Sequence, residues 1–151
     1  QIKFGKEELK EIYTRANISF SNVGEAEKIL GIATLGIEEL LKRMHSLGPK
    51  IVVITDGPKG AYAFDGKEMW FLPEYPTKDT PFERTGAGDA FASTTVVALA
   101  LGKDLPTALS WGAVNSMSVV SQVGAQKGLL NRAEIEKYLK DAPNFKAKQL
   151  K

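Results

Sequence analysis

A glycine-rich turn with an aspartate lies within residues 83–91, ERTGAGDAF. Gly86 and Gly88 flank Ala87, and Asp89 follows directly before an apolar run begins. Glycine permits backbone conformations that are closed to other residues and lets another molecule approach closely. A helix that begins here has several backbone N–H groups without intrahelical partners, and its dipole adds partial positive charge. The segment is therefore suited to binding an anion such as phosphate.

The carboxylate in this anion-binding turn is explained if Asp89 acts as a base. Phosphoryl transfer needs a group that orients and deprotonates the attacking hydroxyl, and donors that stabilise the charge on the transferred group. The same turn would supply both. On the residues alone an alternative stays open, in which Asp89 only caps the helix and the glycines serve tight packing, because aspartate is common at helix starts.

Several segments of the chain together resemble the ribokinase-like, phosphofructokinase-B type (pfkB) family of carbohydrate kinases. They are TGAGDAF at 85–91, VVITDGPKGAYAFDG at 52–66, NVGE at 22–25 and VGAQKG at 123–128. Their order and spacing also fit that family. The resemblance covers nearly the whole chain, and the chain corresponds to about the C-terminal half of the family's usual length.

The resemblance implies both a fold and an activity. The fold is α/β, the C-terminal part of a three-layer α/β/α sandwich with a mostly parallel sheet and a β-hairpin, without the lid and the N-terminal half. Residues 1–151 would form a single nucleotide-binding and catalytic domain. The implied reaction is transfer of the γ-phosphate of ATP to a hydroxyl of a sugar or sugar-like substrate. The implied partners are ATP or ADP with Mg²⁺ and a small sugar or nucleoside, and a homo-oligomer is left open.

The resemblance also implies roles for individual residues. Asp89 matches the catalytic base that takes the proton from the sugar hydroxyl. Gly86, Ala87 and Gly88, with the Asp89 amide, match the anion hole around the transferred phosphate. Further nucleotide contacts are expected from Thr55, Gly57, Gly60, Val119 and Gly124.

Asn22 and Glu25 match a family motif that acts on the nucleotide phosphates and on magnesium, with Glu25 as the metal-associated carboxylate. Magnesium keeps several waters and needs few protein carboxylates, so a single glutamate suits it. The alternative is that both residues only cap a helix.

Two departures from the family pattern limit what is carried over. The motif usually opens with Asp-Thr, where this chain has Glu83-Arg84, and this change argues against a monovalent cation near Thr85 and Gly124. An asparagine that some members place near adenine would align with Ala113, and its role is not transferred to Asn115.

Composition excludes several other classes of function. The chain has 43% hydrophobic and 25% charged residues and a net charge of +2, which suits a folded domain and does not suggest nucleic acid or a membrane surface as partner. It contains no cysteine and no apolar run of about 18 residues, so thiolate chemistry and a transmembrane helix are not expected. These features, with no signal peptide in evidence, are compatible with a cytoplasmic location.

The elements that must position these residues follow from hydrophobic periodicity. Helices are predicted at 23–30 and in TLGIEELLKRMHSLG, and a buried strand at 51–55. A hairpin with a two-residue turn is predicted at Asp65-Gly66. Two long helices, buried nearly all round, are predicted from Ala87 to Leu101 and from Asp104 to near Gly124. A last helix follows Asn131, with Glu134 completing a capping box and an inner face of Ile135, Tyr138 and Leu139.

Two other interpretations compete with the kinase. In a dinucleotide-binding oxidoreductase, G-x-G-x-x-G would begin at Gly86, but Phe91 occupies the third glycine position and no ribose-binding acid follows in a strand. In the other, the chain is a truncated nucleotide-binding fragment without turnover that associates through exposed sheet. A P-loop kinase is disfavoured because the chain has no G-x-x-x-x-G-K-[ST] motif.

Overall fold

The fold is seen in a computed structural model that describes residues 9–33, 36–77, 84–124 and 126–150. By its internal contacts the chain divides into two compact units. Unit 1 comprises Gln1–Phe71 and Gln149–Lys151, and unit 2 comprises Leu72–Lys148.

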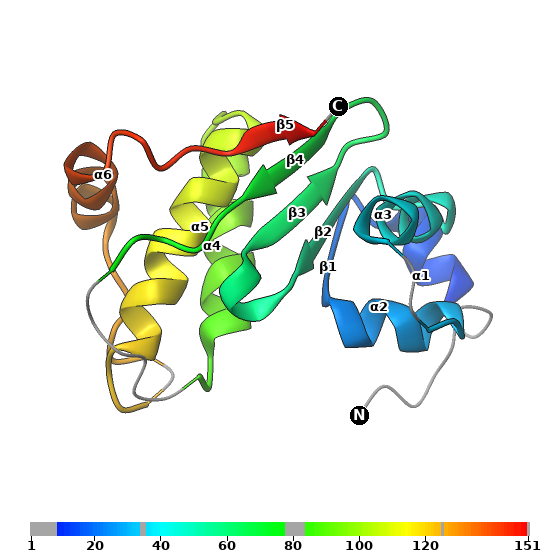
Figure 1. The fold of residues 1–151 in the computed structure, drawn as a ribbon, viewed down its shortest axis with the longest axis horizontal. Coiled ribbons are helices and arrows are strands. Elements are labelled where there is room, and N and C mark those ends of the chain that lie inside the picture. The colour runs from blue at the N-terminus through cyan, green and yellow to red at the C-terminus, as the bar shows by residue number, and fades with distance from the viewer. Residues whose placement is uncertain (1–8, 34–35, 78–83, 125, 151) are drawn as a thin grey trace. The chain divides into compact units, whose positions relative to one another are not determined.

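The described elements alternate between helix and strand in the first half of the chain and are mostly helical in the second (Figure 1). In chain order they are α1 (Lys10–Arg15), β1 (Ile18–Asn22), α2 (Val23–Leu30), α3 (Ile37–Ser46), β2 (Ile51–Thr55), the 3₁₀ turn η1 (Gly57–Lys59), β3 (Ala61–Phe64), β4 (Met69–Leu72), α4 (Ala87–Ala100), α5 (Leu105–Val120), α6 (Arg132–Asp141) and β5 (Lys148–Leu150).

The strands form one sheet in the order β1-β2-β3-β4-β5. β1 runs parallel to β2, with Ile18 opposite Ile51 and Asn22 opposite Thr55. β2 runs antiparallel to β3, so the pairing of the described strands is mixed. The three central residues of β2 are fully buried, which confirms the buried strand predicted from its continuous β-branched run.

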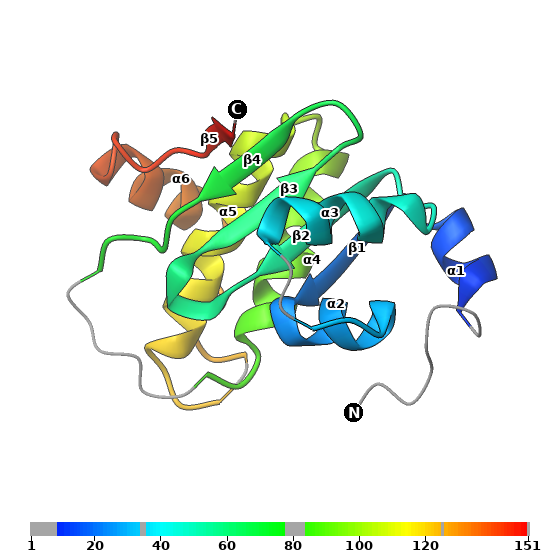
Figure 2. The same cartoon turned by 45° about the vertical axis from the view of Figure 1, so that its right-hand side comes forward.

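The hairpin of β3 and β4 lies where it was predicted (Figure 2). The prediction of a two-residue turn at Asp65-Gly66 is wrong, because the connection is longer. The connection spans residues 65–68, and the Asp65 amide donates to the Glu68 carbonyl at 3.4 Å. The Asp65 carboxylate oxygen Oδ1 accepts from the Lys67 and Glu68 amides at 2.8 and 2.7 Å. An aspartate side chain that bonds the backbone ahead of it favours this longer turn.

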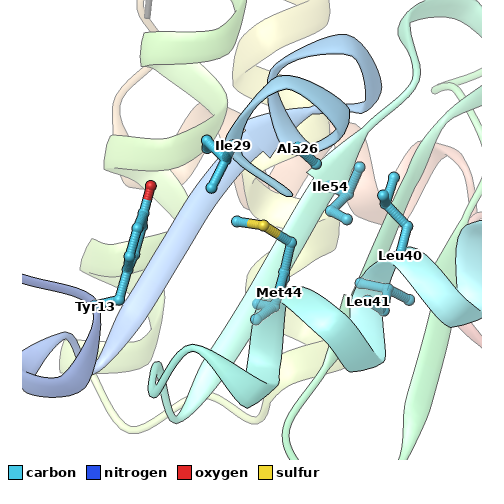
Figure 3. Close-up of a cluster of buried hydrophobic side chains, with 8 residues drawn as sticks. Tyr13, Ala26, Ile29, Leu40, Leu41, Met44 and Ile54 are labelled. Carbon is cyan, nitrogen blue, oxygen red and sulfur yellow. The ribbon is translucent and has the colours of Figure 1, made fainter. Parts of the chain in front are cut away.

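The core of unit 1 forms where α2 and α3 pack on β1, β2 and β3. Figure 3 shows side chains from α1, α2, α3 and β2 gathered into this core. The helix predicted in TLGIEELLKRMHSLG is present as α3, and it buries Leu40, Leu41 and Met44 on one face. The helix predicted at 23–30 is present as α2 with these bounds, and Gly31 ends it in the left-handed region at φ 67°.

In unit 2, α4 and α5 pack side by side (Figures 1 and 2). Gly112 of α5 makes this close approach possible. A Cβ at Gly112 would lie 2.7 Å from the Phe91 carbonyl oxygen and would also collide with the Thr95 hydroxyl. The two helix backbones therefore meet at a distance that only glycine allows.

Burial follows the prediction for α5 and departs from it for α4. Most of α5 is buried, but α4 leaves Val96 and Val97 42% and 53% exposed. The apolar residues all round α4 therefore do not bury it on every side. α5 also ends at Val120, short of the predicted end near Gly124.

The last helix, α6, begins where it was predicted, but its buried face is smaller than predicted. The Asn131 side chain accepts from the Glu134 amide, and the Glu134 carboxylate accepts from the Asn131 amide, which is the predicted capping box. Ile135 is buried, whereas Tyr138 is 38% exposed. Within the described ranges no helix has the length and apolar character to cross a bilayer.

Candidate functional site

The glycine–aspartate turn of unit 2 begins α4, as the sequence predicted. Gly86 is the N-cap residue and lies in the left-handed region at φ 82°, where a Cβ is disfavoured. The Ala87 amide donates to the Arg84 carbonyl at 3.3 Å, and the Gly86 carbonyl accepts from the Ala90 amide at 2.9 Å. The chain thus turns sharply and enters the helix within a few residues.

The first turn of α4 leaves backbone donors free. Among the described residues, none accepts a hydrogen bond from the Gly88 or Asp89 amide, and no side chain caps the helix. Gly88 is exposed, and a Cβ built on it would meet no atom within 4 Å. Tight packing therefore does not explain this glycine. Amides without partners at the N-terminus of an exposed helix have the properties of an anion site.

The Asp89 side chain is exposed and is not engaged in capping. Its carboxylate makes no hydrogen bond or ion pair with another residue in the described ranges, and only its backbone carbonyl accepts, from the Ser93 hydroxyl at 2.7 Å. The capping alternative for Asp89 thus finds no hydrogen bond to support it. An accessible carboxylate beside free amides can accept a proton from a hydroxyl bound in the same place.

In unit 1, residues assigned to nucleotide contacts gather at the carboxyl ends of two parallel strands. Asn22 ends β1, Thr55 ends β2, and the two are opposite one another in the ladder. The turn after Thr55 is closed by the Asp56 amide, which donates to the Gly60 carbonyl at 2.8 Å. Ligands of α/β proteins commonly bind outside this edge of a parallel sheet.

The tight turn after β2 depends on its glycines. Gly57 and Gly60 have φ angles of 53° and 106°, and the Gly60 amide donates to the Gly57 carbonyl at 3.1 Å. Lys59 forms an exposed ion pair with Asp56, Nζ to Oδ2 3.2 Å. Its charge is thus shared with a neighbour, and its side chain is 76% exposed, as in a solvated turn residue.

Asn22 and Glu25 form a capping box at the start of α2. The Glu25 amide donates to Asn22 Oδ1 at 2.8 Å, and the Asn22 amide donates to Glu25 Oε2 at 2.9 Å. The structural alternative is therefore present in the molecule, and it does not exclude a second role. The box uses one carboxylate oxygen, and no described residue hydrogen-bonds the other, Oε1.

The donor set around Glu25 fits magnesium rather than a metal caged by protein. In the described part of the chain no group of three or more histidine, cysteine, aspartate or glutamate side chains could hold a metal ion. Mg²⁺ retains most of its waters and is commonly held by one or two carboxylates together with phosphates of the substrate. A single carboxylate beside a nucleotide meets that requirement.

Val119 and Gly124 lie at and beyond the end of α5. Val119 is 1% exposed, so it presents almost no surface in this structure and its assignment to the nucleotide site stays a prediction. Gly124 has a φ of 97° and its carbonyl accepts from the Lys127 amide at 3.3 Å. Thr85, near the expected cation loop, is exposed, and Glu83 lies outside the described residues.

Asn115 is a polar residue to which sequence reasoning gave no role. It lies in α5 and is 5% exposed. Its Nδ2 donates to Thr94 Oγ1 at 2.7 Å, and its Oδ1 accepts from the Leu130 amide at 2.9 Å. The available signal was the single carboxamide of a mostly apolar helix whose other polar residues carry only hydroxyl groups.

A glycine-rich helix start and a tight turn at the carboxyl edge of parallel strands are typical of nucleotide-binding α/β proteins. The profile described as "pfkB family carbohydrate kinase" matches residues 3–132. The chain is 33% identical over 117 residues to cytidine kinase from Thermococcus kodakarensis, covering 77% of this chain and 41% of that protein. It is 36% identical over 94 residues to ribokinase from Bacillus subtilis, covering 62% and 31%.

Solved structures agree with the sequence relatives. Ribokinase from Arabidopsis thaliana, complexed with ribose and ATP, superposes with a TM-score of 0.80 at 27% identity, covering 87% of this chain and 43% of that one. The chain belongs to the pfkB family of carbohydrate kinases and has the ribokinase-like α/β fold. It spans less than half the length of each of these relatives.

Proposed function

We propose that this chain carries the nucleotide-binding and catalytic residues of an ATP-dependent kinase that phosphorylates a hydroxyl of a sugar or nucleoside. The observation that carries the proposal is the start of α4, where the exposed Asp89 carboxylate stands beside the free Gly88 and Asp89 amides. The family membership, and relatives that phosphorylate ribose or cytidine, support the class of acceptor.

In this proposal, one short turn performs two tasks. The amides of Gly86 to Asp89 hold the transferred phosphoryl group, whose charge rises in the transition state. The Asp89 carboxylate orients the acceptor hydroxyl and takes its proton as the new O–P bond forms and the bond to the leaving ADP breaks. Positioning and charge stabilisation then supply most of the rate acceleration.

The residues of unit 1 hold the nucleotide. Thr55, Gly57 and Gly60 present backbone to it at the strand edge, and Asn22 and Glu25 act on its phosphates and on magnesium, in part through water. Bound Mg²⁺ would neutralise phosphate charge and orient the oxygens. By the family resemblance, Val119 and Gly124, which belong to unit 2, are assigned to the wall for the base.

A second candidate function is nucleotide binding without turnover. It is favoured by the chain's length, which covers 41% of the cytidine kinase that it resembles. The two candidates share the nucleotide site and differ in whether a phosphoryl acceptor is held in line with it. The pfkB match favours both over a dinucleotide-dependent oxidoreductase.

The test is the effect of Asp89→Asn on transfer from MgATP to ribose and to cytidine. Because the amide cannot accept the proton, we expect turnover to fall by roughly 10²-fold or more while MgATP affinity stays within about twofold. Glu38→Gln is the matched control, since Glu38 is an exposed acid in the first turn of α3. Turnover of Asp89→Asn equal to that of the control would rule out the base, and no turnover by the wild-type chain would favour binding alone.

A further inference from the structure

A buried carboxamide joins three parts of unit 2. Asn115 of α5 donates to Thr94 of α4 and accepts from the amide of Leu130, which lies between α5 and α6. Both side chains are buried, with Asn115 5% and Thr94 7% exposed. A buried amide without partners costs free energy, so these two bonds specify where the three segments lie.

Leu130 belongs to the segment of residues 126–131, whose backbone packs closely against α5. A Cβ at Gly128 would lie 2.7 Å from Val119 Cα and would also collide with the Ser118 carbonyl oxygen. The segment therefore lies directly against the last turn of α5. The Leu129 amide donates to the Gln126 carbonyl at 3.2 Å, so residues 126–129 form a turn of their own.

These contacts converge on the residues assigned to the nucleotide wall. Val119 touches the segment through Gly128, and the Gly124 carbonyl accepts from Lys127 at its start. The remaining connection runs from Asn115 to Thr94, in the helix whose first turn carries Asp89. One side chain thus ties the segment beside the wall to the helix of the phosphate turn.

We propose that Asn115 is a positioning residue for the nucleotide: by bonding Thr94 and Leu130 it fixes residues 126–131 against α5 and so sets the wall at Val119 and Gly124. The proposal rests on the nucleotide site of the proposed function. Asn115 makes no contact with the nucleotide in this account and acts only through the segment that it holds.

The primary test is Asn115→Leu, which keeps the branching and the number of heavy side-chain atoms and removes both hydrogen bonds. Amide hydrogen exchange at Leu130 and the affinity for MgADP are measured on the same sample. Loss of a buried hydrogen bond corresponds to a change on the order of tenfold in an equilibrium constant, so we expect about tenfold faster exchange and about tenfold weaker MgADP binding.

Thr94→Val provides a second route if Asn115→Leu does not fold. It is nearly isosteric and removes only the acceptor for Nδ2, so it should weaken MgADP binding in the same direction by a smaller factor. Ser110→Ala is the matched control for loss of a buried α5 hydroxyl, because the Ser110 hydroxyl bonds only within its own helix, to the Pro106 carbonyl at 3.0 Å.

The outcomes separate this inference from the proposed function. MgADP affinity of Asn115→Leu and Thr94→Val equal to that of Ser110→Ala, at equal folded fraction, overturns the positioning role. Unchanged exchange at Leu130 in Asn115→Leu overturns the inference that Asn115 holds residues 126–131 in place, whether or not nucleotide binds. A wild-type chain that binds no MgADP contradicts the proposed function. It also overturns the positioning role of Asn115 toward the nucleotide.

Discussion

Glu25 and Glu134 occupy the same position in two capping boxes of the same chain. Each carboxylate accepts from the amide of an asparagine three residues earlier, at 2.9 Å in α2 and 2.7 Å in α6. Local geometry therefore cannot separate a structural glutamate from a functional one. The difference lies in what surrounds them, since only Glu25 follows a strand whose carboxyl end faces the turn with Thr55 and Gly57.

The paired boxes offer a direct prediction. Glutamine also completes a capping box, so Glu25→Gln and Glu134→Gln should each change the free energy of unfolding by less than about 0.5 kcal/mol. Only Glu25→Gln should weaken MgADP binding, on the order of tenfold, because it removes the carboxylate assigned to the metal and its waters. Calorimetric titration of both variants gives the comparison, and equal affinities would assign Glu25 to capping alone.

Gly88 gives a second prediction at this scale. Since a Cβ there meets open space and valine has a slightly better helix propensity than glycine, Gly88→Val should fold without loss of stability. Its side chain should cover the free amides and weaken binding of a non-hydrolysable MgATP analogue by about tenfold or more, with a smaller effect on MgADP.

The matched control for Gly88→Val is Gly36→Val. Gly36 also stands at a helix start, and a Cβ on it also meets nothing within 4 Å. If both variants bind the analogue as the wild type does, the start of α4 is not the phosphate site.

Which site residues could be recognised from sequence depends on how local their requirements are. The turn at Gly86 needs a positive φ and lies directly before a helix, so the residues themselves carry the signal. Asn115 was missed because its partners Thr94 and Leu130 lie 21 and 15 residues away. Their proximity exists only once α4 and α5 have packed.

At the scale of elements, the start of α5 makes stability depend on pH. Asp104 is the N-cap, and hydrogen bonds from the Thr107 hydroxyl and then from its backbone amide lower the pKa of Asp104 below its ordinary value. The folded state thus binds fewer protons than the unfolded state around that pKa. The stabilisation is present above the unfolded pKa of about 3.9 and is lost as pH falls through the folded pKa.

Asp104→Asn isolates this effect, because asparagine caps a helix about as well as aspartate and does not titrate. We expect the wild type to exceed the variant in free energy of unfolding by a few tenths of a kcal/mol at pH 7, with the difference shrinking as pH falls below about 3.9 and through the lowered pKa of Asp104. Urea titrations across this range measure it. A difference that is the same at both ends would mean that the carboxylate charge does not stabilise α5.

Elements with strong local signals were predicted well, and those that depend on their surroundings were not. α2 has its predicted bounds because Asn22 caps one end and Gly31 the other. The turn of the hairpin was wrong because the Asp65 side chain extends it to Glu68. The exposure of Val97 in α4 could not be read from an apolar pattern, because such a pattern does not say which neighbours are present.

At the scale of the whole molecule, the fold class was accessible from sequence because several family segments recur in order over most of the chain. The pfkB match over residues 3–132 and the TM-score of 0.80 to a ribokinase confirm it. Choice of acceptor is a different matter. The relatives act on both a sugar and a nucleoside, and the chain spans less than half of their length.

The central claim is that this chain's own residues form a nucleotide site. Calorimetric titration of the chain with MgADP, with NADH as the control, tests it most directly. We expect saturable binding of MgADP with about one site per chain and no binding of NADH, because the helix start and strand-edge turn suit phosphates of a mononucleotide. A folded chain that binds NADH instead, or binds neither, would contradict it.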